Sequence, residues 1–419
     1  MHISLVGINH STAPITIREK LAITRGRLRD SLSLLRHYVP HGIILSTCNR
    51  TEVYNIDSDD FRAEETSINF LKAHFNIPDS DWVQRVYVHK NEVAVEHLFR
   101  VASGLDSMII GEFEILGQVK YALEVAEKAR MVNLPLRHLF QSAIRTGRRV
   151  REETGISKNA LSVSSVAVDL AAKIAKEFER CKMLVIGAGE AGRLVAKAAK
   201  EKGISQIIVV SRSQETGSAL AETLGGISAT LNNVVNELST SHIVVTCSGA
   251  PHWILDVRRV EKAMKVRPEL PLVIIDIGVP RNVEPEVGQI NNVFVYNIDD
   301  LTEISNRNRQ QREGEIQMAT EIIAAEVDKF ISWWQALEVR PIVNALMKKA
   351  EDIRRGQLNK TLSKLCNLSD EERDSLEAMT RSIATKILKD PVSHLKANAN
   401  NNKDYIEMIR ELFQLNIER

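Results

Sequence analysis

The feature that most constrains how this chain folds is a glycine-rich segment between a short apolar run at 183–186 and a helical pattern at 193–201. In such a strand–turn–helix, the first glycine permits the tight turn, the second lets the backbone approach a pyrophosphate, and the third lets helix and strand pack closely. Free N–H groups at the helix start attract phosphate. We therefore predict a dinucleotide-binding loop, against the alternative of a glycine turn without a nucleotide. The loop residues are Gly187, Ala188, Gly189, Glu190, Ala191 and Gly192.

Residues 156–300 alternate short apolar, β-branched runs with helical stretches. The runs are MLVIG, QIIVVSR, HIVVTCS, LVIIDIG and VFVYNI. Continuous apolar strands separated by helices are typical of a parallel sheet covered on both faces. This pattern predicts a doubly wound, Rossmann-like nucleotide-binding domain.

The regions on either side differ in their patterns of apolar residues. Residues 1–155 combine helical patterns with strand-like runs, which predicts an α+β domain. The strands are expected at 3–8, 43–48, 53–56 and 83–88. Residues 301–419 carry apolar positions at helical spacing, which predicts an all-α bundle. A length of 419 residues allows about three domains, so the fold class is multidomain α/β.

Local signals subdivide the helical region. The polar residues 303–315 predict a solvated helix that bridges modules. Pro341 is expected to break or restart the chain. A later helix is expected to begin at a capping box of Ser369 and Glu372 and to end at Pro391.

The end of the second predicted strand indicates which nucleotide binds. An NAD site places Asp or Glu about 20 residues after the glycine loop, where it bonds the ribose 2′-hydroxyl. This chain instead has Ser211, Arg212 and Ser213. A guanidinium flanked by two hydroxyls suits a 2′-phosphate, which favours NADPH. The alternative is that Arg212 is merely an exposed residue at a strand end.

Composition excludes some classes of function. Lys and Arg total 55 and Asp and Glu total 54, which excludes nucleic-acid binding by overall charge but not by a local basic face. Aromatic residues make up 5%, which argues against stacking platforms for single-stranded nucleic acid. No apolar run approaches the roughly 20 residues that cross a bilayer. The N-terminal segment has no signal-peptide pattern, so we expect a cytoplasmic protein without membrane contact.

Four cysteines lie far apart, and one of them is a candidate nucleophile. They are Cys48, Cys181, Cys247 and Cys366. No C-x-x-C pair exists, so neither disulfides nor a metal site is expected. Cys48 lies at or just past the end of a predicted strand, and in an extended chain Arg50 points to the same side, where its charge would favour the thiolate. Arg50 would equally bind a substrate carboxylate, and the alternative for Cys48 is a buried structural cysteine. Packing accounts for the other three cysteines.

Three further polar features have structural alternatives. His97 lies on the apolar side of a predicted helix, either as a satisfied core residue or as a polar group aimed into a cleft. The loop after that helix carries many polar side chains, which ordinary loop chemistry would also explain. Five arginines between 137 and 151 form either a solvated face or a surface that meets a phosphate backbone.

Several specific motifs occur in order along the chain. They are GINHSTAP, LSTCNRTEVY, VASGLDSMIIGEFEILGQVK, QSAIRTGRRVREETGI, GAGEAG and IDIGVPRNVEPEVG. Together they resemble the glutamyl-tRNA reductase family over residues 1–300, and the helical region resembles it in architecture. The resemblance implies NADPH-dependent reduction of glutamyl-tRNA(Glu) to glutamate-1-semialdehyde with release of the tRNA. This reaction is the first step of porphyrin and haem biosynthesis by the five-carbon route.

The resemblance also implies residue roles. Cys48 matches the family's nucleophile, which forms a thioester because an ester accepts hydride poorly. His97 matches a histidine important for activity, and Arg50 would hold the glutamate carboxylate. Glu112 would bind the α-ammonium group. The implied substrate-binding residues are Thr47, Asn49, Arg50, Ser107, Glu112, Phe113, Glu114 and Gln118.

One departure concerns Glu114. The family usually has Gly-Glu-Pro-Gln where this chain has Gly-Glu-Phe-Glu. A carboxylate therefore replaces an amide near an anionic substrate, so Glu114 either points away or is offset by Arg50.

The resemblance further implies a homodimer with a catalytic domain at 1–155, an NADP(H)-binding domain at 156–300, and a spinal helix with a dimerisation domain at 301–419. It also implies association with glutamate-1-semialdehyde aminomutase. Two alternatives remain open from the residues. One is a small-molecule NADP-dependent dehydrogenase similar to shikimate dehydrogenase, and the other is a non-catalytic tRNA- or protein-binding scaffold.

Overall fold

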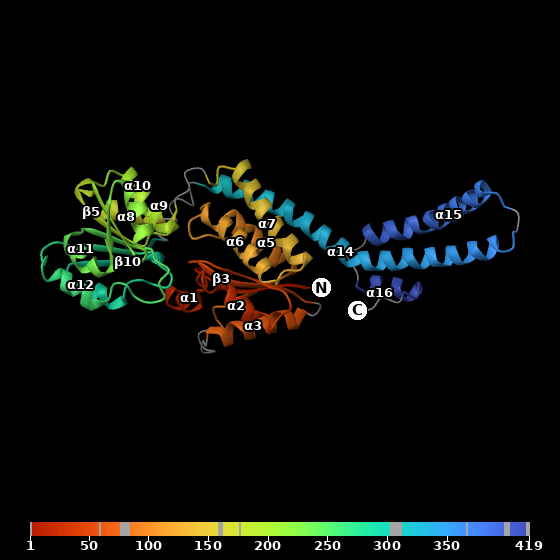
Figure 1. The fold of residues 1–419 in the computed structure, drawn as a ribbon, viewed down its shortest axis with the longest axis horizontal. Coiled ribbons are helices and arrows are strands. Elements are labelled where there is room, and N and C mark those ends of the chain that lie inside the picture. Colours follow the sequence, from red (N-terminus) through yellow and green to blue (C-terminus); the bar gives the residue numbers. More distant parts are fainter. Residues whose placement is uncertain are drawn as a thin grey trace. The chain divides into compact units, whose positions relative to one another are not determined.

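The computed structural model describes residues 2–57, 60–75, 84–157, 162–175, 177–301, 312–365, 368–397 and 403–415. These residues form two compact units, Met1–Glu326 and Val327–Arg419. Figure 1 shows the helices and strands of each unit along the chain. Among the described residues, no helix is long and apolar enough to span a membrane.

The N-terminal part of the first unit is a four-stranded antiparallel sheet between two helical layers. Its strands are β1 (His2–Asn9), β2 (Gly42–Ser46), β3 (Arg50–Asp57) and β4 (Tyr87–Lys90), in the order β2-β3-β1-β4. The helices are α1 (Ile15–Leu21), α2 (Leu28–Leu35), α3 (Asp60–Phe75), α5 (Asn91–Ser103), α6 (Glu114–Lys128) and α7 (Leu134–Glu153). Helices α2 and α3 cover one face and α5, α6 and α7 the other (Figure 1). Because both faces are covered, β1, β2 and β3 are buried almost throughout.

The second part of this unit is a six-stranded parallel sheet. The strands are β5 (Lys182–Ile186), β6 (Gln206–Ser211), β7 (Ile227–Thr230), β8 (Ile243–Thr246), β9 (Leu272–Asp276) and β10 (Val293–Asn297). Their order, β10-β9-β8-β5-β6-β7, is that of a dinucleotide-binding sheet, whose ligand crevice lies where the order reverses beside the first strand. This part of the structure confirms the predicted Rossmann-like, doubly wound fold.

Helices cover both faces of the parallel sheet. They are α8 (Val163–Ile174), α9 (Glu190–Glu201), α10 (Gln214–Leu224), α11 (Val234–Thr240) and α12 (Val257–Met264), joined by the short 3-10 helices η1 (Phe178–Arg180), η2 (Leu231–Asn233), η3 (Pro285–Gln289) and η4 (Ile298–Leu301). Alternate residues of each strand enter two separate cores. Val185 and Val209 pack with α8 and α9, whereas Leu184 and Ile208 pack with α11 and α12. This alternation explains why the strands were recognisable as continuous apolar runs.

Helix α1 carries two ion pairs between the two sheet regions. Arg18 pairs with the carboxylate of Asp299, which also accepts a hydrogen bond of 3.0 Å from the Ile15 N–H. The next residue, Glu19, accepts from Nε and Nη2 of Arg281 at 2.9 and 2.7 Å. Charge-assisted bonds of this kind are stronger than neutral ones and fix orientation. The antiparallel and parallel sheet regions are therefore tied together by two adjacent residues of opposite charge.

The second unit is helical, as predicted, but its helices are longer than expected. They are α14 (Glu313–Leu362), which begins in the first unit, α15 (Asp370–Ala397) and α16 (Lys403–Leu412). The capping box is confirmed, since the Ser369 N–H donates to Glu372 at 2.8 Å and the Glu372 N–H donates to Ser369 at 3.3 Å. Most of the predicted polar bridging segment lies outside the described residues, as does Cys366.

The predicted effects of two prolines were wrong. Pro341 lies inside α14 and Pro391 inside α15, and both helices continue past them. A proline inside a helix costs about 3 kcal/mol through a lost hydrogen bond and a ring clash. Val339 and Ile342 beside Pro341, and Leu388 and Leu395 around Pro391, are buried in one apolar cluster. This packing holds the chain helical on both sides of each proline and outweighs the local cost.

The crossing of α5 and α7 yields a stability prediction. A Cβ atom on Gly147 of α7 would lie 2.5 Å from the carbonyl oxygen of Ala102 on α5. Because such overpacking costs about 1–3 kcal/mol, Gly147→Ala should lower the free energy of unfolding by that amount. In urea denaturation followed by circular dichroism, the transition should move to lower urea concentration.

Gly117 of α6 provides the matched control, since a Cβ there would meet no atom within 4 Å. Gly117→Ala should raise the free energy of unfolding by about 0.5–1 kcal/mol, because alanine favours the helix. Equal shifts in the same direction for both variants would contradict a close helix crossing at Gly147.

Candidate functional site

Cys48 lies just past the end of β2, in a tight turn. Strand β2 ends at Ser46 and β3 begins at Arg50, so the extended-chain argument that placed Cys48 and Arg50 on one side does not apply. The Thr47 hydroxyl accepts from the N–H groups of Asn49 at 3.1 Å and Arg50 at 3.2 Å, which closes the turn. Arg18 donates to the Cys48 carbonyl oxygen at 2.7 Å. The turn therefore presents the thiol from a fixed backbone.

The surroundings of the thiol keep it protonated. Cys48 is half-buried beside the apolar core that contains α8 and α9. Burial, with the nearby carboxylates of Glu112 and Glu114, raises the pKa of the Cys48 thiol to about 12, and Arg18 opposes this shift. The cation that favours the thiolate is therefore Arg18, and not Arg50 as the spacing predicted. The free thiol is a poor nucleophile at neutral pH, because the thiolate is the reactive form.

Arg50 is held inside a network centred on Glu52. Both side chains are buried, with 1% of Arg50 and 0% of Glu52 exposed. Nη1 of Arg50 donates to Glu52 at 2.9 Å. Nη2 of Arg50 donates to the Asp106 carbonyl oxygen at 2.6 Å. The hydroxyls of Tyr54 and Tyr87 donate to Glu52 at 2.7 and 2.6 Å. Sequence reasoning assigned no role to Glu52, although its spacing of two from Arg50 on a strand placed both on one face.

His97 completes this network. Its Nε2 lies 2.8 Å from Oε1 of Glu52, and its Nδ1 lies 3.8 Å from Asp106. Although burial alone raises the pKa of Glu52, the charges of Arg50 and His97 and the hydrogen bonds to Glu52 hold that pKa well below its usual range. Glu52 is therefore a permanent buried anion that orients a cation and an imidazole.

A cavity of about 570 Å³ opens beside this network, with His97 and Ser107 in its wall. His10, from the GINHSTAP motif, lines the same cavity, and its Nδ1 is buried without a hydrogen-bond partner. Burial, followed by the charges of Arg50 and Arg18, lowers the pKa of His10 to about 4, so its imidazole is neutral at pH 7. The motif was used to identify the resemblance, but the sequence did not indicate His10 as a site residue.

Other unpartnered polar atoms lie in the same part of the sheet. Oδ1 of Asn49 and Nε of Arg50 are buried without hydrogen-bond partners among the described residues. Residue Asn9, which precedes His10, is paired with Arg50 in the β1–β3 register. Buried polar groups are normally satisfied, so such atoms indicate a place where a polar ligand binds.

The loop between α5 and α6 carries Glu112. Gly104 and Gly111 adopt positive φ values of 80° and 81°, which lets the loop fold back on itself. Burial raises the pKa of the Glu112 carboxyl to about 7, although the Ser107 hydroxyl opposes the shift. Arg151, from the arginine run, donates to the Glu112 carbonyl oxygen at 2.9 Å. At least one arginine of that run therefore supports the loop rather than forming a solvated face.

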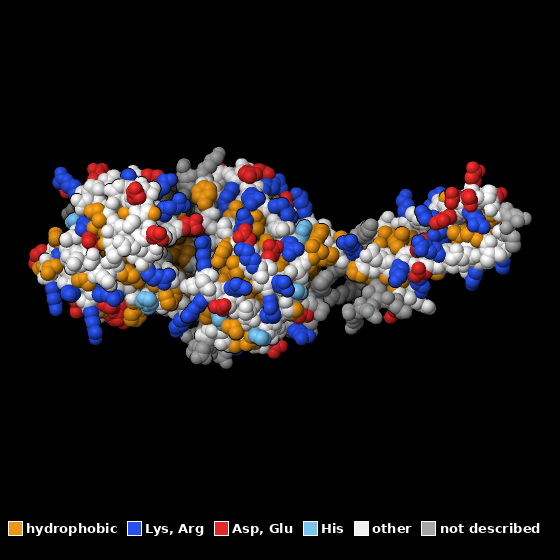
Figure 2. All heavy atoms as spheres, viewed as in Figure 1, with side chains coloured by type: hydrophobic (Ala, Val, Ile, Leu, Met, Phe, Trp, Pro, Cys, Tyr) orange, Lys and Arg blue, Asp and Glu red, His pale blue; other side chains and the backbone are white. Residues whose placement is uncertain are grey.

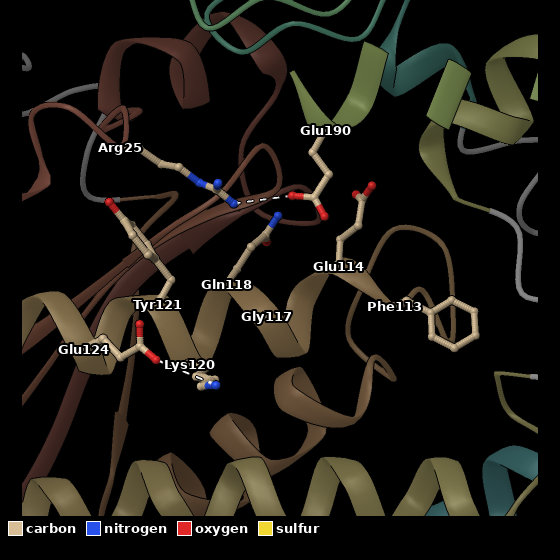
Figure 3. Close-up of a pocket in the computed structure, with 9 residues that line it drawn as sticks. All are labelled: Arg25, Phe113, Glu114, Gly117, Gln118, Lys120, Tyr121, Glu124 and Glu190. Atoms are coloured by element: carbon tan, nitrogen blue, oxygen red, sulfur yellow. Dashed lines mark ion pairs between the residues drawn. The ribbon is translucent and has the colours of Figure 1, made fainter. Parts of the chain in front are cut away.

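The remaining predicted recognition residues line a different hollow. A cleft of about 320 Å³ is bordered by Phe113, Glu114 and Gln118 together with Arg25 and Tyr121. Figure 3 shows Glu114 and Gln118 projecting from α6 toward an ion pair of Arg25 with the Glu190 carboxylate, whereas Phe113 points away. The structure thus separates Gln118 and Glu114 from the cavity that contains His97 and Ser107.

The glycine loop lies beside a third cavity, of about 450 Å³. Gly187 adopts a φ of 122°, and a Cβ on Gly192 would lie 1.9 Å from the Gly187 carbonyl oxygen, so both positions require glycine. A Cβ on Gly189 would meet nothing within 4 Å, which leaves its backbone open to a ligand. Glu190, Ala191 and Gly192 form the first turn of α9. These properties fit the pyrophosphate of a dinucleotide.

The structure places the predicted nucleotide-selecting residues along that cavity. Gly187, Ala188, Gly189, Ser211, Arg212 and Ser213 line it. The Ser213 hydroxyl accepts from the Thr216 N–H at 3.4 Å and so begins α10. Thr216, Ser248 and His252 line the same cavity and were missed, because no local motif marks them. Among the described residues, no cluster of His, Cys, Asp and Glu is arranged to hold a metal ion.

Comparisons with known proteins agree along the whole chain. Residues 6–154 match the glutamyl-tRNA(Glu) reductase N-terminal domain, 169–304 match the shikimate/quinate 5-dehydrogenase family, and 318–415 match the glutamyl-tRNA(Glu) reductase dimerisation domain.

Full-length relatives extend this agreement. Glutamyl-tRNA reductase of Natranaerobius thermophilus is 38% identical, covering 100% of this chain and 93% of that protein. The Carboxydothermus hydrogenoformans enzyme is 40% identical, covering 100% of this chain and 94% of that protein. The structure of the Methanopyrus kandleri glutamyl-tRNA reductase is similar with a TM-score of 0.50 and 32% identity, covering 99% of both chains. The chain therefore belongs to the glutamyl-tRNA reductase family.

Proposed function

We propose that this chain reduces glutamyl-tRNA(Glu) to glutamate-1-semialdehyde with NADPH and releases the tRNA, through a thioester on Cys48. This reaction would be the first step of tetrapyrrole synthesis. The observation that carries the proposal is Cys48 itself, presented on a rigid turn near buried, unpartnered polar atoms. The relatives' names support the substrate. The division at 1–155, 156–300 and 301–419 is part of the same proposal.

Glu112 is the group suited to activate the thiol. Its carboxylate is close enough to raise the pKa of Cys48, and its own pKa is raised by burial to about 7. In the proposed step, Glu112 takes the thiol proton while sulfur attacks the ester carbonyl carbon. The bond from that carbon to the ribose oxygen then breaks, and Glu112 returns the proton to the leaving oxygen. The products are the thioester on Cys48 and free tRNA.

Arg50 and His97 position the substrate through the groups that the network leaves free. Arg50 retains an unpartnered Nε–H, which can donate to the glutamate side-chain carboxylate. Nε2 of His97 is bound to Glu52, whereas Nδ1 makes only a long contact of 3.8 Å with Asp106, so Nδ1 is the nitrogen available to the ester carbonyl. Both groups are held in place by the buried anion rather than by the substrate.

The cofactor cavity fits a nicotinamide dinucleotide phosphate. The open backbone at Gly189 and the start of α9 would hold the pyrophosphate, and Arg212 with Ser211 would hold the 2′-phosphate. The bound cofactor supplies the hydride that takes the thioester to the aldehyde level. Cys48 then leaves as the thiolate and regains its proton.

We further infer that the second unit forms a homodimer, because it matches a dimerisation-domain family. Hydrophobic side chains are visible on its surface in Figure 2. Met379, Ile383 and Ile387 lie four residues apart on α15 and are 51%, 51% and 66% exposed. Such a stripe is typical of a helix that packs against a partner. Association with the aminomutase that uses the aldehyde stays a prediction.

The nucleophile is tested with labelled glutamyl-tRNA, with and without NADPH. The wild type should give NADPH-dependent aldehyde, and Cys48→Ser should give none, because a serine hydroxyl is a far weaker nucleophile and a poorer leaving group. Cys181→Ser, at a position that precedes β5, should keep wild-type activity. Full activity in Cys48→Ser would contradict the assignment.

The role of Glu112 is tested by the pH dependence of Cys48 acylation without NADPH. In the wild type, the rate should rise through about pH 7, because Glu112 must lose its proton before it can accept that of the thiol. In Glu112→Gln this step should disappear, leaving only the rise toward the thiol's own pKa, which the loss of the Glu112 charge lowers.

Alkylation of Cys48 by iodoacetamide separates this role from simple electrostatics, because alkylation reports only the thiolate fraction. Removing the Glu112 charge lowers the thiol pKa, so alkylation of Glu112→Gln should be faster than that of the wild type. An acylation step near pH 7 that survives in Glu112→Gln would exclude Glu112 as the proton carrier.

Cofactor selectivity is tested at Arg212. Arg212→Ala should weaken NADPH binding about 10- to 100-fold and leave NADH binding nearly unchanged, since only NADPH carries the 2′-phosphate. Arg258→Ala, an exposed arginine of α12, is the matched control and should change neither. Fluorescence titration with each cofactor measures both constants. Equal losses for the two cofactors would refute 2′-phosphate recognition.

A further inference from the structure

Two separate hollows lie along the segment that joins α5 to α6, and the proposed substrate has two halves. Ser107 and Met108 of this segment line the 570 Å³ cavity, and Glu114 lines the 320 Å³ cleft. Cys48 packs against the core that contains Met108 and Ile109, so the turn lies beside the segment that borders both hollows. Resting on the function proposed above, an aminoacyl ester joins an amino acid to a terminal nucleoside at the bond that sulfur attacks. Each half therefore needs its own recess next to the nucleophile.

The cleft carries a planar stack suited to a nucleobase. The guanidinium carbon of Arg25 lies 5.2 Å from the centroid of the Tyr121 ring. Unpaired bases bind proteins by stacking on aromatic rings and on guanidinium planes. Gln118 is three residues before Tyr121 on α6, which places both on one face of the helix. Figure 3 shows the Gln118 amide projecting into the same hollow, where it can bond the edge of a base.

The charges of the cleft favour a nucleoside over a phosphate. The lining contains the carboxylates of Glu114, Glu124 and Glu190 against the cations of Arg25 and Lys120. Carboxylates accept hydrogen bonds from ribose hydroxyls and base amino groups but repel phosphate. The phosphate of a bound nucleotide would therefore lie outside the cleft.

An oxygen atom without a hydrogen-bond partner indicates where the ribose binds in the cleft. Oε1 of Glu114 is buried without a hydrogen-bond partner, and Glu114 is the cleft carboxylate that acts on Cys48. Arg25 pairs with Glu190 at 3.7 Å with side chains 66% and 58% exposed, and such exposed pairs contribute little. Arg25 can therefore shift to admit a base at small cost.

We propose that this cleft binds the 3′-terminal nucleoside of the tRNA, with its base stacked on Tyr121 and Arg25 and its ribose hydroxyl donating to Glu114. The ester then lies between the cleft and the glutamyl cavity, over the thiol. A carboxylate at position 114 is explained by this contact, because it accepts from the ribose rather than facing the anionic amino acid.

Acylation of Cys48 in the absence of NADPH tests the proposal with two donors. One donor is glutamyl-tRNA, and the other is a glutamyl thioester of N-acetylcysteamine, which has no nucleoside. Tyr121→Ala should slow acylation by glutamyl-tRNA about 10- to 100-fold, the effect of losing one stacked base, and leave acylation by the thioester within twofold of the wild type. Tyr121→Phe, which keeps the ring, should behave as the wild type.

Arg25 and Arg29 provide a matched pair of arginines. Arg25→Ala should slow only the tRNA donor, whereas Arg29→Ala, on the exposed surface of α2, should affect neither donor. Equal slowing of both donors in Tyr121→Ala, or no slowing of either, would overturn the nucleoside site.

The other source of a nucleoside is the nicotinamide end of the cofactor. If Tyr121→Ala weakened NADPH binding tenfold or more and left acylation by glutamyl-tRNA unchanged, the cleft would belong to the cofactor and the proposal would be wrong. Failure of the wild type to be acylated by either donor would refute the reductase function itself, and the nucleoside site with it.

Discussion

The buried carboxylate of Glu52 is the interaction on which the site depends. It lies at the meeting point of β3, β4 and α5 and accepts hydrogen bonds from Tyr54 and Tyr87 while it pairs with Arg50 and His97. An ion buried this deeply is tolerated only when charge and hydrogen bonds compensate for lost hydration. Removing one partner would leave an unpaired charge in the core. The positions of His97 and Tyr87 in the wall of the 570 Å³ cavity therefore depend on this anion.

The network also holds Arg50, the arginine two residues after Cys48, in a fixed position. Arg50 is fixed by hydrogen bonds to Glu52 and to the Asp106 carbonyl oxygen, which use two of its five N–H donors. Such preorganisation lowers the entropy lost on binding. The thiol of Cys48, in contrast, is held in its protonated form by burial and by the nearby carboxylates. A thiol in this environment reacts slowly with oxidants and alkylating agents.

Sequence predicted the features that local chemistry determines. The parallel sheet and the glycine loop were predictable, because strand periodicity and the turn at Gly187 depend on neighbouring residues. The environment of Cys48 was not, since Arg18 lies thirty residues before it in the chain and Glu112 lies far after it. The predictions at Pro341 and Pro391 were wrong for a related reason. Packing between helices, which the local sequence does not show, keeps α14 and α15 helical past both prolines. The division of the recognition residues between two hollows likewise depends on tertiary structure.

The adjacent charges of α1 have a consequence for how the two sheet regions meet. Arg18 binds Asp299 and Glu19 binds Arg281, so neighbouring positions require partners of opposite sign. Sliding the short helix by one residue would bring either Arg18 toward Arg281 or Glu19 toward Asp299, depending on the direction, and either contact would be repulsive. Hydrophobic contacts alone would tolerate such a slip, because they have no sign. The order of the two charges in this dipeptide therefore selects one docking position for the nucleotide-binding sheet.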